Sequence, residues 1–280
     1  MTSWKRAAVR MLFTAAAVYA LLIALLWWQQ ERLLFAPTRL PAGHRFVLGP
    51  DVHERWIDVP GARLNVLHLR NPKADGAVFF LHGNGGSLDS WFVNPAFYRA
   101  LNLDLVMLDY RGYGKSSGRI ESQAQLVADV RAAWDATMAE YAGRRRVVYG
   151  RSLGSGLAAM LAADVQPELT VLVSPYESMR ALAAEHYPWV PGAVLRYPLD
   201  TAGALPGIRG PVVLMHGDAD TLIGVQHSQR LKALRPDAAL VVVPGAAHND
   251  LQSFPAYLDP LRAYLVPKIL SPASPKPGMM

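Results

Sequence analysis

The stretch RRVVYGRSLGSGLAAMLAA, residues 145–163, decides the fold. It begins as a short apolar run, passes through the pentapeptide Gly150-Arg151-Ser152-Leu153-Gly154, and continues as a small-residue segment with helical periodicity. The flanking glycines remove side chains that would collide with a neighbouring strand and helix, so Ser152 can occupy a sharp, strained turn. The stretch therefore predicts a buried strand, a tight turn that holds the Ser152 hydroxyl clear of a sheet, and a helix directly after it.

Further apolar runs on both sides of this stretch predict the rest of a sheet. The predicted strands are residues 55–59, 64–70, 77–82, 105–109, 146–150, 169–174, 211–216 and 239–243, and the predicted helices are 90–101, 122–141, 153–164, 225–234 and 254–265. The last six strands are continuously apolar, which is typical of a parallel sheet buried on both faces, whereas the first two alternate and favour an exposed antiparallel ribbon. The alternation of strands and helices predicts an α/β fold with a mostly parallel central sheet and helices on both faces.

Functional groups of such sheets lie beyond the carboxyl ends of the strands. A serine hydroxyl there needs a histidine base, and the base needs a carboxylate that orients it. Asp218 and Asp220 follow the strand at 211–216, and His248 follows the strand at 239–243, so all three are expected at the edge that carries Ser152. The order serine, carboxylate, histidine is the one expected for this motif, and the spacing leaves both aspartates open.

The oxyanion of a tetrahedral intermediate requires hydrogen-bond donors near the nucleophile. We expect the backbone N–H of Leu153 to be one donor, since it follows the serine directly. The loop His82-Gly83-Asn84-Gly85-Gly86-Ser87 follows the strand at 77–82, and the backbone N–H of Asn84 is the best candidate for the second. Gly83 and Gly85 would allow the backbone to approach a substrate closely.

Five motifs taken together resemble a known family. HGNGGS at 82–87, LDYRGYGKSSG at 108–118, YGRSLGSG at 149–156, HGDAD at 216–220 and GAAHND at 245–250 are similar to the α/β-hydrolase superfamily, in particular its membrane-anchored ABHD-type, serine aminopeptidase-like branch. The resemblance covers roughly residues 30–268. It implies an α/β-hydrolase fold with Ser152 as nucleophile, His248 as base and Asp220, which matches the family's H-G-x-x-D aspartate, as acid. Gly224 departs from the proline that relatives commonly carry there.

Residues 11–28 carry no charge over 18 positions and would form about 27 Å of helix, close to the thickness of a bilayer core. Lys5, Arg6 and Arg10 precede this segment, and tryptophans lie at both of its ends. We expect an uncleaved single-pass signal-anchor at residues 1–29, with a cleaved signal peptide or a buried helix as alternatives. The positive-inside rule then places a hydrolase domain at 30–268 on the non-cytoplasmic side, in the periplasm of a Gram-negative cell.

Two further segments complete the predicted organisation. Residues 175–210 are too long for a simple crossover and are expected to form a small apolar cap, in which Tyr176 and Trp189 would contact the substrate. Residues 269–280 are rich in proline and serine and are expected to be a disordered tail. An apolar cap beside a membrane anchor favours a lipid-like or acylated ester or thioester substrate. A peptidase or amidase of the same fold and a non-catalytic, membrane-tethered binding protein remain alternatives.

Composition excludes several other classes of protein. With 51% hydrophobic and 18% charged residues among 280, most of the chain cannot be intrinsically disordered, and the lack of cysteine excludes disulfides, thiolate metal sites and a cysteine nucleophile. Residues 1–40 hold five basic groups and one acidic group, which leaves only +2 of the net charge of +6 for the rest of the chain. Nucleic-acid binding is therefore not expected. We expect neither a metal nor an organic cofactor, and the sequence leaves the oligomeric state open.

Overall fold

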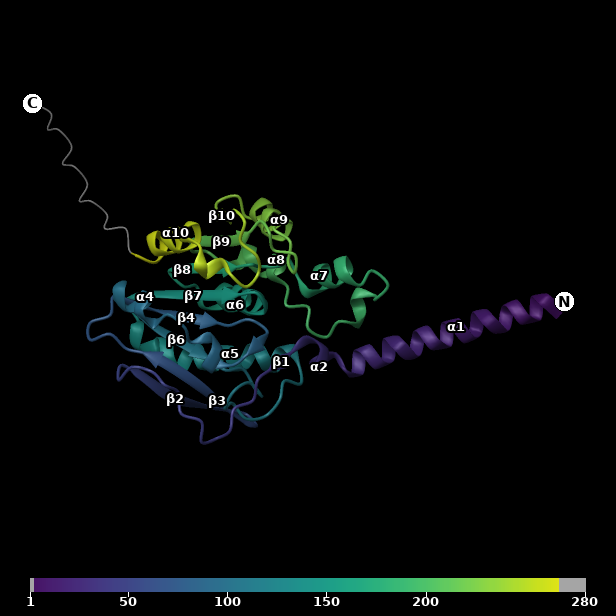
Figure 1. Ribbon diagram of the computed structural model, residues 1–280, viewed down its shortest axis with the longest axis horizontal. Helices are drawn as coiled ribbons and strands as arrows, with labels where there is room; N and C mark the ends of the chain where they lie inside the picture. Colours follow the sequence, from purple (N-terminus) through teal and green to yellow (C-terminus); the bar gives the residue numbers. More distant parts are fainter. Residues whose placement is uncertain (1–2, 267–280) are drawn as a thin grey trace, which may run out of the picture.

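Eight strands form one sheet in the computed structural model, which describes residues 3–266 (Figure 1). The strand order is β10-β9-β8-β7-β4-β6-β3-β2. The first six strands in this order pair parallel with one another. The strands are β2 (Val52–Val59), β3 (Ala62–Leu69), β4 (Gly76–Leu81), β6 (Leu103–Leu108), β7 (Arg145–Arg151), β8 (Leu169–Val173), β9 (Val212–Gly217) and β10 (Ala239–Val243). The predicted mostly parallel sheet is confirmed.

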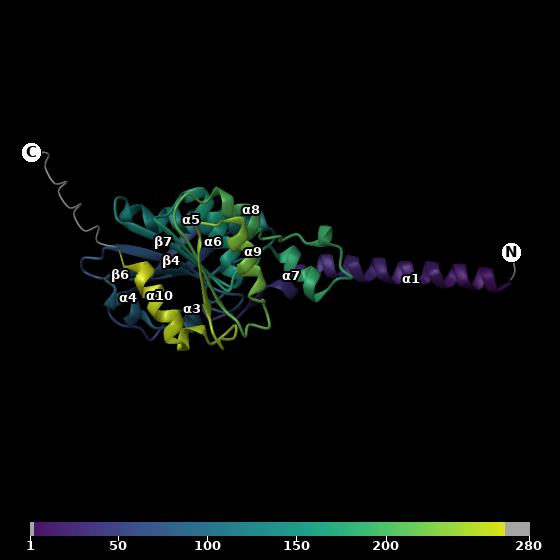
Figure 2. The same cartoon turned by 90° about the horizontal axis from the view of Figure 1, so that it is seen from above.

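Helices cover both faces of the sheet, as predicted (Figure 2). One face packs against α5 (Gln123–Met138), α6 (Leu153–Val165), α8 (Thr201–Ala204) and α9 (Gln226–Leu234). The other packs against α3 (Leu88–Trp91), α4 (Pro95–Ala100) and α10 (Pro255–Leu265). Successive strand residues supply the two cores alternately, with Phe79 in the first and Phe80 in the second, because strand side chains point to opposite faces.

The prediction of an exposed ribbon at the start of the sheet is wrong for one of its two strands. β2 and β3 do pair antiparallel, but β3 also pairs antiparallel with β6, and its residues Leu64–Leu69 are buried. β2 alone forms the edge. The alternation that suggested a ribbon comes from polar residues such as Asn65 and His68, which are fully buried and hydrogen-bonded.

The predicted helix at 90–101 is two short helices, α3 and α4. Asn94 adopts a left-handed backbone conformation with φ of 55°, and Pro95 begins α4. Proline is favoured in the first turn of a helix and disfavours a helical conformation in the residue before it, so the pair ends one helix and starts the next. The predicted helix at 122–141 is α5 followed by the 3₁₀ turn η1 (Ala139–Tyr141). Two residue pairs, β1 (Ala36–Pro37) and β5 (Gly85–Gly86), form a small separate parallel sheet that the sequence did not indicate.

The N-terminal helix α1 (Ser3–Trp28) projects away from the sheet and is followed by α2 (Gln30–Leu34) (Figure 1). It is the one helix in residues 3–266 that is long and apolar enough to cross a membrane, and none of its most apolar window is buried. The segment between β8 and β9 contains α7 (Met179–His186), η2 (Gly192–Val194), α8 and η3 (Leu205–Gly207). Its α7 end lies beside α1 in both views (Figures 1 and 2). The predicted tail at 269–280 lies outside the described residues.

Candidate active site

The turn between β7 and α6 has the geometry that its glycines predict. Ser152 adopts φ of 52° and ψ of −123°, a conformation that costs free energy in a residue with a side chain. A Cβ on Gly154 would lie 2.1 Å from the carbonyl oxygen of Leu81, and one on Gly150 would lie 2.3 Å from that of Gly154. Only glycine fits at either position, so the crossing of strand and helix depends on both residues.

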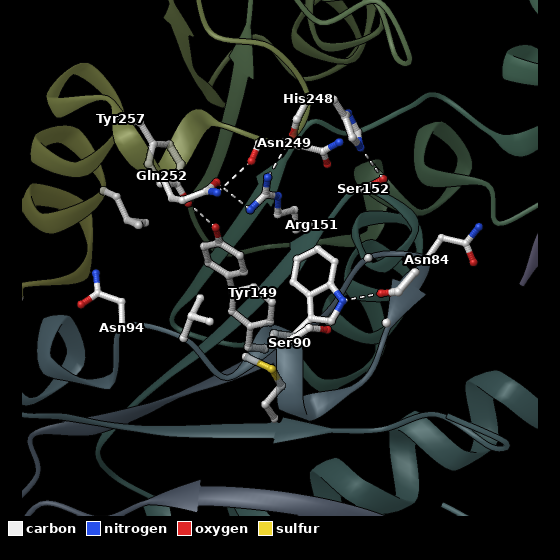
Figure 3. A pocket seen from close by; sticks show the side chains of 18 of the residues that line it. Asn84, Ser90, Asn94, Tyr149, Arg151, Ser152, His248, Asn249, Gln252 and Tyr257 are labelled. Carbon is white, nitrogen blue, oxygen red and sulfur yellow. Dashed lines mark hydrogen bonds between the residues drawn. The ribbon is translucent and has the colours of Figure 1, made fainter. Parts of the chain in front are cut away.

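Ser152, His248 and Asp220 form a continuous hydrogen-bonded chain. The Ser152 Oγ lies 2.9 Å from Nε2 of His248, and Nδ1 of the same ring lies 2.7 Å from Oδ2 of Asp220. Figure 3 shows the serine and the histidine meeting at the edge of a pocket. The three residues come from the ends of β7, β9 and β10, as the topology of the sheet requires.

The structure also separates the two aspartates that the sequence left open. Asp220 is buried, and its Oδ1 accepts hydrogen bonds from the backbone N–H groups of Leu222 and Ile223 at 3.0 and 2.9 Å. Asp218 points elsewhere, and its carboxylate accepts a hydrogen bond from the backbone N–H of Gly245 at 2.6 Å. Asp218 therefore holds the loop after β10, and Asp220 holds the histidine.

Asp220 remains ionised in spite of its burial. Burial by itself would raise the pKa of this carboxyl, but the adjacent His216 ring and hydrogen bonds from His248 and the Ile223 N–H outweigh it and hold the pKa well below its ordinary value. The sequence analysis did not find His216 in this role. Its Nε2 lies 3.4 Å from Asp220 and 2.7 Å from the carbonyl oxygen of Ile223, and its Nδ1 lies 2.7 Å from Ser228 Oγ. An ionised Asp220 favours the histidine orientation in which Nε2 faces the serine.

Of the two predicted oxyanion donors, Leu153 directly follows the serine and Asn84 lines the same cavity. Leu153 is the first residue of α6, so its N–H has no partner within the helix. The Asn84 side chain accepts hydrogen bonds from the Ala36 N–H and the Tyr113 hydroxyl, both at 3.1 Å, so the side chain fixes the loop and the backbone remains for a ligand. Gly83 lies against the serine, because a Cβ there would be 3.5 Å from the Ser152 Cβ and 2.8 Å from the Trp91 ring.

A cavity of about 620 Å³ opens from Ser152 across the α4 and α10 side of the sheet (Figure 3). Gly83, Asn84, Gly85 and His248 line it near the serine. Its remaining wall is largely apolar and aromatic and includes Phe80, Trp91, Phe97, Met107, Tyr149, Tyr257, Leu258 and Leu261. A long apolar group attached to a reacting centre at Ser152 would fit along this wall.

Two pocket residues that the sequence analysis missed fix the mouth of the cavity. Arg151 donates hydrogen bonds to the carbonyl oxygen of His248 at 2.9 Å and to Gln252 at 3.0 Å, and its guanidinium lies over the Trp91 ring at 5.5 Å (Figure 3). The Trp91 Nε1 donates to the carbonyl oxygen of Gly85 at 2.5 Å. Together they join the Gly83–Gly86 loop to the histidine loop. Arg151 directly precedes Ser152 in the pentapeptide, and this position was the only sequence signal that could have pointed to it.

The two predicted cap contacts are absent from this cavity. Tyr176 is fully buried, and its hydroxyl donates a hydrogen bond to the carbonyl oxygen of Leu153 at 3.0 Å, so it stabilises the start of α6. Trp189 is 50% exposed and lies beside α1, where its carbonyl oxygen accepts a hydrogen bond from Tyr19 at 2.9 Å. Within residues 3–266, the cavity lining includes no residue of 175–210. The cavity therefore does not include the two contacts predicted for the insertion, and Trp189 instead contacts α1.

Comparisons with known proteins found related sequences and similar folds. The family model described as Serine aminopeptidase, S33 (Hydrolase_4) matches residues 72–201. An uncharacterized protein of Mycobacterium tuberculosis is 32% identical over 89% of this chain and 92% of its own. Alpha/beta hydrolase domain-containing protein 17B of Xenopus tropicalis is 30% identical over 75% of this chain and 74% of its own. Among solved structures, the Pyrococcus furiosus esterase Pf2001 superposes with a TM-score of 0.66 at 21% identity, covering 83% of this chain and 97% of the esterase, which shows a shared fold.

Proposed function

Since the chain belongs to the α/β-hydrolase superfamily and is a hydrolase, we propose that it is a membrane-anchored serine hydrolase that cleaves carboxylic ester or thioester bonds of acylated or lipid-like substrates. The observation that carries the proposal is the hydrogen-bonded chain from Ser152 through His248 to Asp220. A serine in a strained turn, a base at 2.9 Å and a buried carboxylate behind the base form the arrangement that nucleophilic acyl transfer requires.

The proposed reaction proceeds in two steps through an acyl-enzyme. His248 Nε2 accepts the Ser152 proton as Oγ attacks the carbonyl carbon, and the protonated ring then donates that proton to the departing alcohol or thiol. Water next attacks the acyl-serine with the same histidine as base, which releases the acid and restores the serine. The backbone N–H groups of Asn84 and Leu153 would stabilise the oxyanion in both steps.

The cavity supports an acyl group as the part of the substrate that is recognised. Its wall offers aromatic and aliphatic side chains, and within the described residues its lining contains one arginine, Arg151, and neither aspartate nor glutamate. An aminopeptidase must accommodate the ammonium group of its substrate, which a carboxylate would neutralise. The lining therefore favours a neutral or anionic acylated substrate over a peptide with a free N-terminus.

Membrane attachment is the second part of the proposal. The 26 residues of α1 would extend about 39 Å, enough to cross a bilayer. No residue of the segment is buried, and its three basic residues all lie in the N-terminal third. These features support an uncleaved anchor with the catalytic domain on the non-cytoplasmic side, which a C-terminal alkaline phosphatase fusion tests. An inactive phosphatase alongside an active cytoplasmic reporter would reverse this topology.

The test of the chemistry is labelling with a fluorophosphonate probe in detergent. The wild-type chain should be labelled, and Ser152→Ala should not be. Ser90→Ala is the matched control, because Ser90 lines the same cavity and should leave labelling intact. A correctly folded wild-type chain that resists the probe would instead support a tethered binding protein. A series of p-nitrophenyl esters and the corresponding thioesters then separates the proposed substrates from amides.

A further inference from the structure

A second apolar element lies beside α1, in the insertion between β8 and β9. The loop Tyr187–Leu195 has the sequence YPWVPGAVL and carries no charge, although Glu185 and His186 precede it and Arg196 follows it. The side chains of Tyr187 and Trp189 are 57% and 50% exposed. Exposed aromatic side chains on a proline-rich apolar loop are costly in water and are enriched where proteins meet the membrane interface.

The loop is fastened to α1 and α2 by specific hydrogen bonds. Tyr19, more than halfway along α1, donates its hydroxyl proton to the Trp189 carbonyl oxygen at 2.9 Å. Gln30 donates to the Val194 carbonyl oxygen at 3.1 Å and accepts from the Arg196 N–H at 2.6 Å. Both views place this part of the insertion alongside the C-terminal part of α1 (Figures 1 and 2). The depth of α1 in a bilayer would therefore also set the depth of the loop.

That depth can be calculated from helix geometry. Nine residues from Tyr19 to Trp28 correspond to roughly 14 Å along the helix axis. With residues 11–28 spanning the acyl core, Trp28 lies at its outer boundary, and Tyr19 and the Trp189 carbonyl lie roughly 14 Å below that boundary.

The backbone of the loop is suited to that environment, where unsatisfied polar groups are costly. Pro188 and Pro191 have no N–H group to satisfy. The N–H groups of Val190 and Val194 bond to carbonyl oxygens three residues earlier, both at 2.9 Å. Tyr19 and Gln30 satisfy two further carbonyl oxygens of the loop. Much of the backbone polarity is thus paired without water.

The surface at the level of Trp28 has the charge expected opposite lipid phosphates. Trp28 lines a groove together with Arg32, Arg39, Arg119 and Arg196; Glu121 pairs with Arg119 and Glu31 with Arg196, and a further lining residue, Arg111, is buried and paired with Asp129. Arg196 also lies over the Trp27 ring, with its guanidinium 4.9 Å from the ring centroid. Arginine and tryptophan at one level, with an uncharged loop beyond them, reproduce the order of headgroup and acyl layers.

We propose that Tyr187–Leu195 is a second membrane-contacting element that enters the acyl layer of the leaflet on the domain's side of the bilayer. The inference rests on the proposed anchoring by α1. The loop and α1 together provide two points of attachment, which fix the tilt of the catalytic domain relative to the membrane in a way that a single helix would not.

The chain has no cysteine, so single cysteines report one position at a time. Full-length Val190→Cys, labelled with the environment-sensitive dye NBD, tests the loop in phosphatidylcholine nanodiscs. Leu21→Cys, 70% exposed on α1, reports the anchor, and Val47→Cys, 99% exposed before β2, reports solvent. Thermal unfolding checks that each labelled chain retains its fold.

The expected result is blue-shifted NBD emission at positions 190 and 21, quenching of both by doxyl-labelled lipid, and protection of both from dithionite, with position 47 unprotected. Protection at 21 without protection at 190 overturns the loop proposal and leaves the anchor intact. Loss of both overturns both. A further outcome would also overturn the proposal: protection of position 190 from dithionite that increases with protein concentration, without quenching by doxyl lipid. It would show that the loop contacts a second copy of the chain. None of these readouts depends on hydrolase activity, which fluorophosphonate labelling tests separately.

Discussion

β7 and β8 are neighbouring parallel strands, yet the segments that follow them differ sharply. After β7 the chain turns within one residue, Ser152, and steric contacts at Gly150 and Gly154 leave it almost no freedom. After β8 the chain leaves the sheet for the insertion at 175–210, whose loop at 187–195 forms hydrogen bonds with Tyr19 and Gln30, far away in the sequence. Function that depends on local sterics can be read from a motif, whereas function that depends on docking between distant segments cannot.

The largest expected effect is a loss of activity on substitution of one of the two aspartates that follow β9. We expect Asp220→Asn to lower kcat by about 10⁴-fold, because an amide favours the wrong histidine tautomer. Asp218→Asn should be far milder, since Asp218 bonds to the Gly245 backbone and not to His248. Steady-state hydrolysis of a p-nitrophenyl ester measures both variants. A reversal of their order would contradict the assignment of Asp220.

The next largest expected effect is on the stability of the fold at acidic pH. The folded chain holds the pKa of Asp220 below its ordinary value of 3.8, so the ionised carboxylate stabilises the fold at higher pH, and this contribution is lost as the pH falls below about 4. Urea unfolding should therefore show a stability difference between wild type and Asp220→Asn that shrinks with acidification. Asp218→Asn serves as the control. A difference that widens toward low pH would show that the carboxylate is not stabilised as described.

The wall of the cavity should set the acyl chain length. Leu258→Trp narrows the cavity, and we expect kcat/KM for long-chain esters to fall by roughly 10- to 100-fold, while acetyl esters are little affected. Leu234→Trp makes the same change on an exposed part of α9 and should alter neither. Equal losses for short and long chains would place the acyl group elsewhere.

The smallest effect compares two tyrosines of the insertion. Tyr176→Phe removes a buried hydrogen bond to the Leu153 carbonyl and should lower the free energy of unfolding by about 1 kcal/mol. Tyr187→Phe makes the same chemical change on a side chain that is 57% exposed, and it should change stability by less than about 0.5 kcal/mol in detergent. Thermal unfolding measures the stability of both variants. Equal losses of stability would contradict the expectation that the buried Tyr176 stabilises the domain more than the exposed Tyr187.

Much of the fold could be predicted from the sequence, because continuous apolar runs are characteristic of strands buried on both faces. The boundaries of β8 and β10 lie within one residue of those expected. β3 was misjudged because its buried polar residues Asn65 and His68 imitate the alternation of an exposed strand. Their partners Glu54 and Tyr141 are brought in by other elements, and no local pattern reveals such pairings.

The sequence by itself determined the parallel sheet, the strained turn at Ser152, the apolar helix α1 and the positions of His248 and the two aspartates beyond strand ends. These features follow from periodicity, glycine sterics and chain order, which act over a few residues. Only the tertiary structure decided between Asp218 and Asp220, added His216 and Arg151 to the site, and moved Tyr176 and Trp189 out of it. The physical reason is that a side chain's role depends on the partners and burial it finds after folding, and the loop after β9 offers two carboxylates at nearly the same place in the chain.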